Sequence, residues 1–249
     1  MGAARILRSA VSTPASTSAS VSGSALVYEV AERIKEKILS GDLPIGAQLR
    51  QALLAEEFGV SRMPVREALR QLQNGGLITV LPNRGAIVRV PAPWEVREAY
   101  EVRAELEALA ARRAVRRITP DVIADLRALN SDMRARASGV RPAADLPPAA
   151  RHRGSETFHG LIAGSAENAR LTRMIDELHG SFPRNILVQL LAADPRYCAA
   201  NFAEHDAIVD ALEAGDAEAA GSLMREHVLR AGEQLSRWFE QRSSTVFRG

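Results

Sequence analysis

The stretch that most constrains the fold is residues 59–70, which read GVSRMPVREALR. Gly59 suits the end of a preceding helix, because only glycine adopts the left-handed conformation there at little cost. Ser61 can bond the free amides of a new helix, and Pro64 is tolerated in a first turn, where its missing N–H costs little. The stretch therefore predicts a tight turn followed by a helix.

This predicted helix has two different sides. Arg62, Arg66 and Arg70 are four residues apart and therefore share one face. Residues 53–58 form a short amphipathic segment upstream. Helix, glycine turn and basic helix together make a helix-turn-helix pattern, although an ordinary helical hairpin with solvated arginines has the same local spacing. The opposite face is apolar at helical spacing and consists of Val65, Ala68, Leu69 and Leu72.

The flanking segments favour the helix-turn-helix interpretation. Residues 25–40 predict a helix, and residues 77–80 and 86–90 are β-branched runs that predict a hairpin. The hairpin turn at residues 81–85 places Arg84 at its tip, with Gly85 beside it. Three helices and a hairpin are the order of a winged helix-turn-helix. Residues 59–91 contain five arginines and one glutamate, which gives a net charge of +4 and suits phosphate binding.

Composition sets wider limits on the chain. Its 249 residues suit one large or two ordinary domains, and its formal net charge is only +2. Cys198 is the single cysteine, so an intramolecular disulfide and a cysteine-based metal motif are excluded, and a reducing cytoplasm is the simplest location. No apolar run approaches the roughly 18 residues of a membrane span. Residues 1–24 are rich in Ala, Ser and Thr and predict a disordered tail rather than a transit peptide.

The remaining chain predicts an all-α domain. Pro91 and Pro93 form a stiff linker, and helical patterns follow near residues 94–117, 119–137, 149–164, 167–181, 183–191, 195–214 and 216–242. The domain boundaries are therefore residues 25–91 and 92–242, with a C-terminal tail at 243–249. In the first of these helices the predicted inward stripe is Val102, Leu106, Leu109 and Val115.

Three histidines and one arginine are predicted to point into this bundle. His159, His205 and His227 each share a helix face with apolar residues. A hydrogen-bonded core histidine explains any one of them, but three together also suit a His₃ metal site. An inward Arg103 needs an anionic partner, which is either Glu107 or another internal carboxylate, or a bound ligand.

Residues 26–90 resemble the DNA-binding domain of GntR-family transcription regulators. The resemblance rests on many spaced positions, including LPxG at 43–46, LAE at 54–56, GVSRxPVREAL at 59–69, GL at 76–77 and RGA at 84–86. The sequence departs at Gln51-Ala52, where the family often has an acidic residue followed by an arginine that contacts DNA. The resemblance implies a winged helix-turn-helix that contacts operator DNA through Arg50, Ser61, Arg62, Pro64, Arg66, Arg70, Arg84 and Gly85.

Residues 94–240 resemble the FCD domain of the FadR-type branch, a ligand-binding and dimerisation bundle. The matching positions are RxxLE at 103–107, Phe158-His159, Asn168, EHxxIxxALxxGD at 204–216 and MxxH at 224–227. The resemblance implies metal ligands at His159, His205 and His227, joined in the family by an aspartate whose position here is Ser155. Water, an effector oxygen or Glu156 could fill that fourth position around zinc, nickel or manganese, or the site is metal-free. By the same resemblance, Arg103 and Ser155 would face a small carboxylate effector.

Three functions compete at this point. The first is a homodimeric transcription regulator, by this resemblance a repressor, whose operator binding changes with a small acid; it is not an enzyme and needs no membrane. The second is a metal hydrolase with a His₃ site, which leaves the wing and the basic helix unexplained. The third is an architectural DNA binder that has lost its effector, which Ser155 supports.

Overall fold

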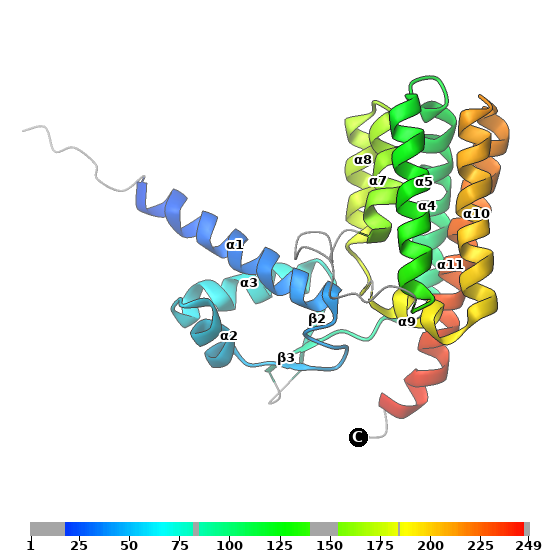
Figure 1. Ribbon diagram of the computed structural model, residues 1–249. Helices are drawn as coiled ribbons and strands as arrows, with labels where there is room; N and C mark the ends of the chain where they lie inside the picture. The colour runs from blue at the N-terminus through cyan, green and yellow to red at the C-terminus, as the bar shows by residue number, and fades with distance from the viewer. Residues whose placement is uncertain (1–17, 82–84, 140–153, 184, 247–249) are drawn as a thin grey trace, which may run out of the picture.

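The structure is a computed structural model that describes residues 18–81, 85–139, 154–183 and 185–246, with the side chains of 18–22, 154–157 and 242–246 outside that description. Figure 1 shows an N-terminal part and a helical bundle side by side. The N-terminal part contains α1 (Ser18–Ser40), β1 (Gln48–Leu49), α2 (Gln51–Phe58), α3 (Arg62–Asn74), β2 (Ile78–Leu81) and β3 (Gly85–Val88). The bundle contains α4 (Pro93–Ala114), α5 (Pro120–Ala137), α7 (Gly154–Ser165), α8 (Ala169–His179), α9 (Asn185–Ala193), α10 (Pro195–Glu213) and α11 (Ala217–Val246).

The N-terminal part confirms the winged helix-turn-helix. Gly59 ends α2 with φ 68°, the left-handed value that glycine adopts readily, and α3 follows from Arg62. Ser61 occupies the N-cap position, but its side chain makes no capping hydrogen bond, so the expected cap is wrong in its chemistry although right in its place. The predicted apolar face of α3 meets that of α1 in one core, which includes Val30, Ile34, Ile38, Val65, Ala68, Leu69 and Leu72.

The wing contains one strand that the sequence did not predict. The sheet has the order β1-β3-β2, with Gln48 opposite Ile87 and Val80 opposite Ala86 in antiparallel pairs. β1 has only two residues, which is too short for an alternating pattern to be visible in the sequence. The predicted wing tip at residues 82–84, including Arg84, lies outside the described residues.

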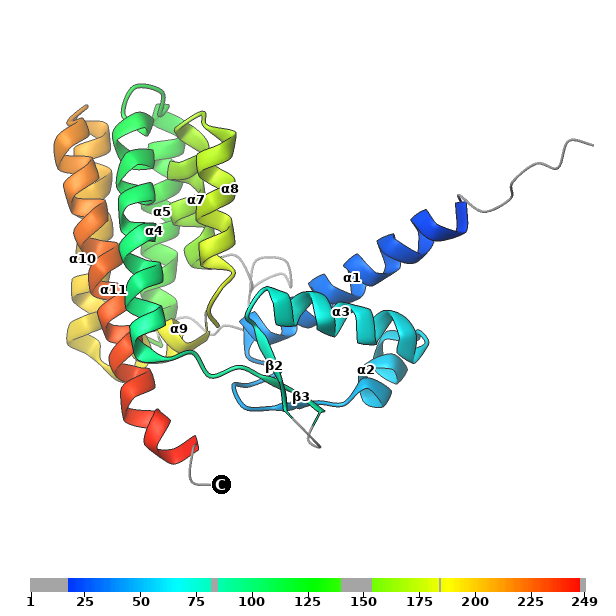
Figure 2. The same cartoon turned by 180° about the vertical axis from the view of Figure 1, so that it is seen from behind.

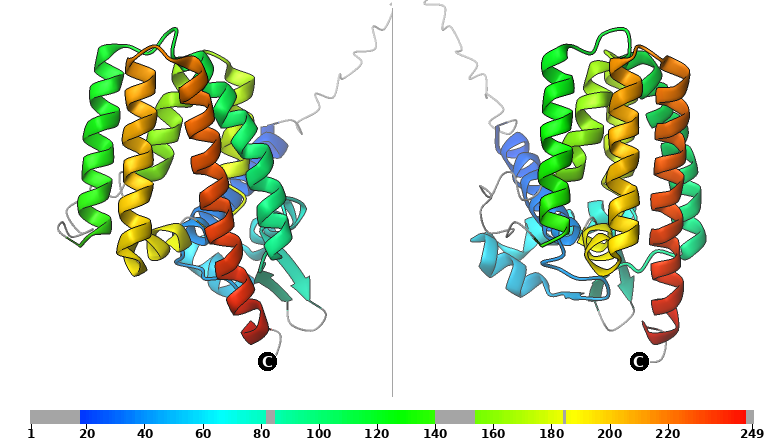
Figure 3. Two further views of the ribbon diagram at one scale, coloured as in Figure 1. Left: turned by 90° about the vertical axis from the view of Figure 1, so that its right-hand side faces the viewer. Right: turned by 45° about the vertical axis from the view of Figure 1, so that its right-hand side comes forward.

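Two boundaries differ from expectation. α1 begins at Ser18 rather than at residue 25, so part of the predicted tail continues the helix, while residues 1–17 lie outside the description. α11 continues to Val246 rather than ending at residue 242. In Figure 3 this last helix runs along the bundle and extends beyond it at the lower end. None of the described helices combines the length and apolar character needed to cross a membrane.

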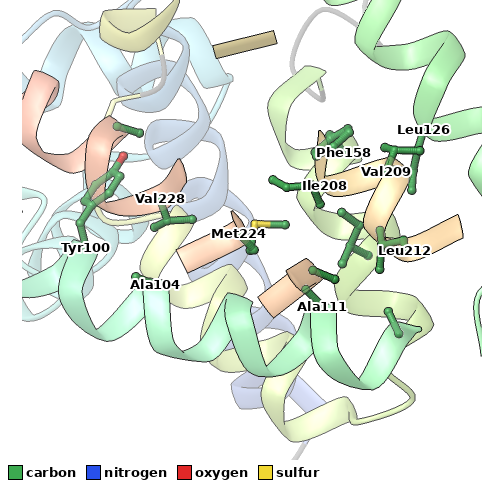
Figure 4. Packing of buried hydrophobic residues seen from close by; sticks show 14 of the residues in the cluster. Tyr100, Ala104, Ala111, Leu126, Phe158, Ile208, Val209, Leu212, Met224 and Val228 are labelled. Carbon is green, nitrogen blue, oxygen red and sulfur yellow. The ribbon is translucent and has the colours of Figure 1, made fainter. Parts of the chain in front are cut away.

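The bundle is all-α, as predicted, but one inward stripe is only half right: Leu106 and Val115 pack partly buried against the core, whereas Val102 and Leu109 do not. Val102 and Leu109 on α4 are 53% and 40% exposed, whereas Tyr100 and five alanines of the same helix are buried. Small residues let α4 and α11 approach closely: a Cβ added at Gly232 would lie 2.5 Å from the Cβ of Tyr100. The prediction is therefore wrong for Val102 and Leu109, which lie on the outer side. The core that results is drawn in part in Figure 4 and includes Ala104, Ala111, Phe158, Leu212, Met224 and Val228.

A charged contact joins the wing to the bundle. Arg89, which follows β3, donates through Nε to the carbonyl of Gly76 at 2.6 Å and through a terminal N–H to Glu95 at 2.7 Å. Glu95 lies in the first turn of α4 and also accepts the backbone N–H of Ala92 at 2.7 Å. These bonds fix the course of the short Pro91–Pro93 connection between the two parts.

Candidate functional site

The outer face of α3 carries the three predicted arginines into solvent. Arg62, Arg66 and Arg70 are all exposed. Arg70 donates to Glu67 on the same helix at 3.1 Å, and Arg66 lies 3.8 Å from that carboxylate. These exposed contacts are weak in water and can be exchanged for contacts with another anion at little cost. The face therefore remains able to bind phosphates or base edges.

The other predicted DNA contacts border this face. Arg50 is exposed and donates to Gln48 at 3.2 Å, and Ser61 and Pro64 begin the helix that carries the arginines. Gly85 starts β3 with φ +74°, a conformation that favours glycine. Arg84 beside it lies outside the described residues.

The three histidines converge inside the bundle from three helices. His159 lies on α7, His205 on α10 and His227 on α11, and all three are buried. One ring nitrogen from each lies within 4.8 Å of the others, which is the spacing of a possible metal site. The helix-face positions predicted only that each histidine points inward, and the family resemblance implied that the three meet.

A second residue fixes the orientation of each imidazole. The Nδ1 of His159 contacts a carboxylate oxygen of Glu107. The Nδ1 of His205 lies 2.9 Å from the amide oxygen of Asn130, whose NH₂ group donates to two other oxygens. The Nδ1 of His227 lies 2.8 Å from Glu204. Histidine ligands of metals commonly donate their second ring N–H to such oxygens.

These partners determine which nitrogens carry lone pairs. Carboxylate and amide oxygens accept, so the Nδ1 atoms of His205 and His227 are the protonated ones in the neutral rings. Their Nε2 atoms, 3.1 Å apart, then face each other with two lone pairs. A shared proton or a cation is needed to relieve that repulsion. Two nitrogens bound at about 2.0–2.1 Å to a tetrahedral zinc lie about 3.3 Å apart, so the residues fit a divalent ion.

Glu107 is the buried anion around which the charged groups gather. Arg103 on the same helix donates to it at 2.5 Å, and His179 contacts its other side at 2.9 Å. Burial alone would raise the pKa of Glu107, but the positive charge of Arg103 and the bonds from His159 and His179 hold that pKa well below its usual range. The internal partner of Arg103 is therefore Glu107, one of the two possibilities that the sequence left open.

His179 is the residue of this cluster that sequence reasoning missed. It lies at the end of α8, and together with Glu107 and His159 it forms a second group of close metal-binding side chains. His159 belongs to both groups, through one ring nitrogen in each. No spacing along the chain links residue 179 to residue 107, so only the packing of α8 beside α4 could reveal the contact.

The environment keeps the three histidines uncharged. Burial lowers the pKa of His159 and of His227, while the neighbouring carboxylates Glu107 and Glu204 oppose the shift only in part. The pKa of His205 is lowered well below its usual value by burial and by the two neighbouring imidazoles. Neutral imidazole is the form that binds metals, so the electrostatics and the geometry agree.

A cavity of about 70 Å³ adjoins the histidines. It has room for several water molecules and is much smaller than a drug-sized site. All three histidines and Arg103 contribute to its wall, as do His179 and Asn201, so it combines imidazole and guanidinium groups with apolar side chains. Ser155 and Glu156 belong to α7, one turn before His159, but their side chains lie outside the described residues.

Comparison with known proteins gives two family matches. The profile described as "Bacterial regulatory proteins, gntR family" matches residues 26–88, and the FCD domain profile matches residues 98–230. A D-xylose utilization operon transcriptional repressor of Paenarthrobacter nicotinovorans is 33% identical over 215 residues, covering 85% of this chain and 89% of the relative. A gluconate operon transcriptional repressor of Bacillus licheniformis is 36% identical over 97 residues, covering 39% of this chain and 40% of the relative.

Solved structures agree on the fold. The McbR/YncC structure from E. coli covers 88% of this chain and 98% of its own length, with a TM-score of 0.66 and 24% identity. A GntR-type transcriptional regulator from Rhodococcus sp. RHA1 covers 90% of this chain and 98% of its own length, with a TM-score of 0.62 and 22% identity. At these identities the likeness establishes a shared arrangement of helices and wing.

Proposed function

The chain belongs to the GntR family of bacterial transcription regulators and carries an FCD effector-binding domain, and on this basis we propose that it is a homodimeric repressor released from its operator by a small carboxylate. It is a DNA-binding regulator and not an enzyme. A repressor of bacterial operators works where the chromosome lies, so the proposal includes a cytoplasmic location. The observation that carries the effector half is the cavity that Arg103 and three convergent histidines line together.

The DNA half of the proposal assigns roles along α3. Arg62 and Arg66 open the helix and reach base edges in the major groove, where arginine can pair with guanine. Arg70, one turn later, contacts phosphate, and Ser61 and Arg50 position the helix on the backbone. Arg84 and Gly85 of the wing approach the neighbouring minor groove. A short helix reads few bases, so a homodimer on an inverted repeat doubles the site.

The metal half assigns His159, His205 and His227 as ligands of zinc, nickel or manganese. A divalent ion there supplies a positive charge that attracts a carboxylate. The three side chains hold α7, α10 and α11 together around the ion, and Glu107, Asn130 and Glu204 keep their second nitrogens protonated. Ser155 stands where the family has an aspartate, so an anionic protein ligand is missing and an effector oxygen can take that position.

Arg103 would hold the far oxygen of the effector. Its Nε donates to Glu107, and a guanidinium carries five N–H donors, so it can bind a second anion beside Glu107. The small cavity favours an acid of few carbon atoms, or one whose entry widens the site. Gluconate should be among the acids tested, because one relative is named for a gluconate operon. D-xylose, for whose operon another relative is named, is a neutral sugar and serves as the comparison.

The experiment combines operator release with thermal shift. An operator selected from a random duplex library is bound by the protein, and anisotropy then follows release by organic acids and by D-xylose, each with and without chelator. We expect at least one acid to release DNA and to raise the melting temperature in a metal-dependent way. Release by D-xylose but by no acid would contradict a carboxylate effector. Release by none of the ligands would also contradict it and would favour an architectural DNA binder.

Variants separate the metal from the fold. His205→Ala should abolish the effect of chelator on the melting temperature, whereas the control Glu56→Ala, exposed on α2 and outside the bundle, should keep it. Ser155→Asp should tighten metal binding and weaken the acid effector, because it restores an anionic ligand at the position that the effector uses. Elemental analysis without metal, after reconstitution with zinc, nickel and manganese, would remove the ion and leave Arg103 and the histidines to hold the acid directly.

A further inference from the structure

Asn201 lies on the same side of α10 as the buried His205. Tyr197, Asn201 and His205 are four residues apart along this helix, so they share one face, and all three line the cavity beside the histidines. Successive members of this stripe are about 6 Å apart along the helix axis. Figure 2 shows α10 at one edge of the bundle, where it packs beside α9 and α11. The cavity therefore follows α10 from the histidines toward the start of that helix.

The side chain of Asn201 is buried without a hydrogen-bond partner. Only 8% of this residue is exposed, yet no hydrogen bond joins its amide group to any described residue. The other buried polar and charged side chains of the described residues all have such a partner; they are Arg103, Glu107, Asn130, His159, His205, His227 and Ser236. The amide oxygen of Asn185 is sealed off by its neighbours, whereas both amide atoms of Asn201 remain open to the cavity. Buried polar groups in native proteins are almost always bonded, so this amide is free for a bound molecule.

Tyr197 adds a second hydrogen-bonding group at the end of this stripe. Burial raises the pKa of its hydroxyl, which therefore stays protonated and can donate. No hydrogen bond joins that hydroxyl to another described residue. A ligand with several hydroxyls can therefore bond Asn201 and Tyr197 in succession.

The wall of the cavity disfavours a second charge at the Asn201 end. Arg103 is the one permanently charged side chain on the described wall, and the proposal above already uses it for the carboxylate of the effector. Phe182, Leu187 and Leu191 line the same cavity, so a second carboxylate would lose its hydration without a cation to compensate. A hydroxyl carries no charge and can either donate to the amide oxygen of Asn201 or accept from its NH₂ group.

We propose that Asn201 selects effectors that carry a hydroxyl beyond their carboxylate, so that the protein responds to hydroxylated acids rather than to alkyl or dicarboxylic acids. The inference rests on the proposed carboxylate effector and adds its chemical class. Water can satisfy the amide of Asn201 before a ligand binds, and a ligand that displaces this water must replace its hydrogen bond. A hydroxylated acid does so, whereas an alkyl acid leaves the amide unpaired, and sites that hydrogen-bond a hydroxyl reject analogues without one for this reason.

Acids matched in carbon number test this selection. Dissociation constants for gluconate, hexanoate and adipate, and for the shorter glycerate, propionate and malonate, are measured by isothermal titration calorimetry on the full chain, with and without added zinc. We expect the hydroxylated acid of at least one set to bind about tenfold or more tightly than the alkyl and dicarboxylic acids of that set. If the hydroxylated acid is the tightest ligand in neither set, the hydroxyl selection is overturned while the carboxylate effector stands. Binding of none of the six acids would overturn both.

Asn201→Leu tests the residue, with Gln189→Leu on the exposed side of α9 as a matched loss of an amide. In Asn201→Leu the hydroxylated acid should bind about tenfold more weakly and the alkyl acid no more weakly than before, so that their ratio falls to within about threefold. Gln189→Leu should leave the ratio unchanged. Weaker binding of both acids by the same factor in Asn201→Leu would show a merely structural role and overturn the proposal. The comparison of acids on the unchanged protein decides the selection even where circular dichroism shows that this variant does not fold.

Discussion

On α3 the side chains of Arg66 and Arg70 are 57% and 69% exposed, whereas in the bundle the side chain of Glu107 is only 3% exposed. The two arginines share one glutamate at the surface, where ion pairs contribute little to stability. Glu107 is bonded at once to Arg103, His159 and His179, far from water. The arginines of α3 are therefore available to bind a partner. Glu107 and the three side chains around it already bind one another.

This difference separates recognition from folding. A charge on α3 can be changed with little effect on the fold, because water and salt already screen it. A charge in the bundle cannot be removed alone, since its partner would stay buried without compensation. Substitutions in the two regions should therefore change different measurements, and by different amounts.

The largest expected effect is at the centre of the bundle. Glu107→Ala leaves the guanidinium of Arg103 buried beside a lost carboxylate, and removal of one partner of a buried pair typically costs about 3–5 kcal/mol. The free energy of unfolding, measured by urea denaturation of the bundle, should fall by that amount. The exposed Glu56→Ala on α2 is the matched control and should leave it nearly unchanged. If both substitutions lowered the free energy of unfolding equally, Glu107 would not be the buried anion that holds Arg103 and the two histidines.

The next effect is the pH dependence of the metal-free protein. The folded state lowers the pKa of His159, His205 and His227 below the usual 6.5, so unfolded chains bind protons first as the pH falls. Stability should be complete above about pH 6.5 and decrease below it, by up to about 1.4 kcal/mol per pH unit for each histidine, until the folded protein is protonated.

Thermal unfolding in chelator between pH 7.5 and 5 checks this slope. His205→Asn should make the decrease shallower, because one lowered pKa is lost. All five histidines follow residue 91, so the winged domain should show no matching change over the same range. A melting temperature of the bundle that is flat between pH 6.5 and 5 would contradict the uncharged state of the buried histidines.

The sequence predicted the two regions unequally, for physical reasons. The apolar spacing of α3 and the positive φ of Gly59 depend on neighbours within a few residues, so the helix-turn-helix could be predicted locally. The inward direction of His159, His205 and His227 also followed from helical periodicity. The contacts of Glu107 with His179 and of Asn130 with His205 join residues far apart in the chain, and no local pattern contains them.

The error at Val102 and Leu109 of α4 has a different cause. Side-chain size alone predicts burial of these two residues in preference to alanine. The close approach of α4 and α11 at Gly232 instead selects small side chains for the interface and leaves the larger ones outside. A family resemblance implied that the three histidines meet, and they do lie together; that they bind a metal, and the effector, stay predictions.

On α3 a smaller effect appears only when DNA is present. Arg66→Ala should leave the melting temperature unchanged but lower the preference for the selected operator, since a good arginine–guanine contact contributes about 1–3 kcal/mol of discrimination. Arg70→Ala should weaken all sequences similarly and reduce the salt dependence of binding by about one phosphate contact. Anisotropy with the operator and with a scrambled duplex at several salt concentrations measures both. Equal loss of preference in the two variants would remove the distinction between base and phosphate contacts.

The smallest expected effect concerns the N-cap residues of α8 in the bundle and α3 in the winged domain. Asn168 caps α8 by accepting the N–H of Leu171 at 3.1 Å, so Asn168→Ala should cost about 1 kcal/mol of stability, as cap losses typically do. Ser61 has the same position on α3 but makes no such bond, so Ser61→Ala should change the free energy of unfolding by less than about 0.5 kcal/mol. Its exposed hydroxyl remains able to donate to a phosphate at the start of the recognition helix. We therefore expect Ser61→Ala to weaken binding to the operator and to a scrambled duplex alike, and a loss of stability equal to that of Asn168→Ala would show that the hydroxyl serves the fold instead.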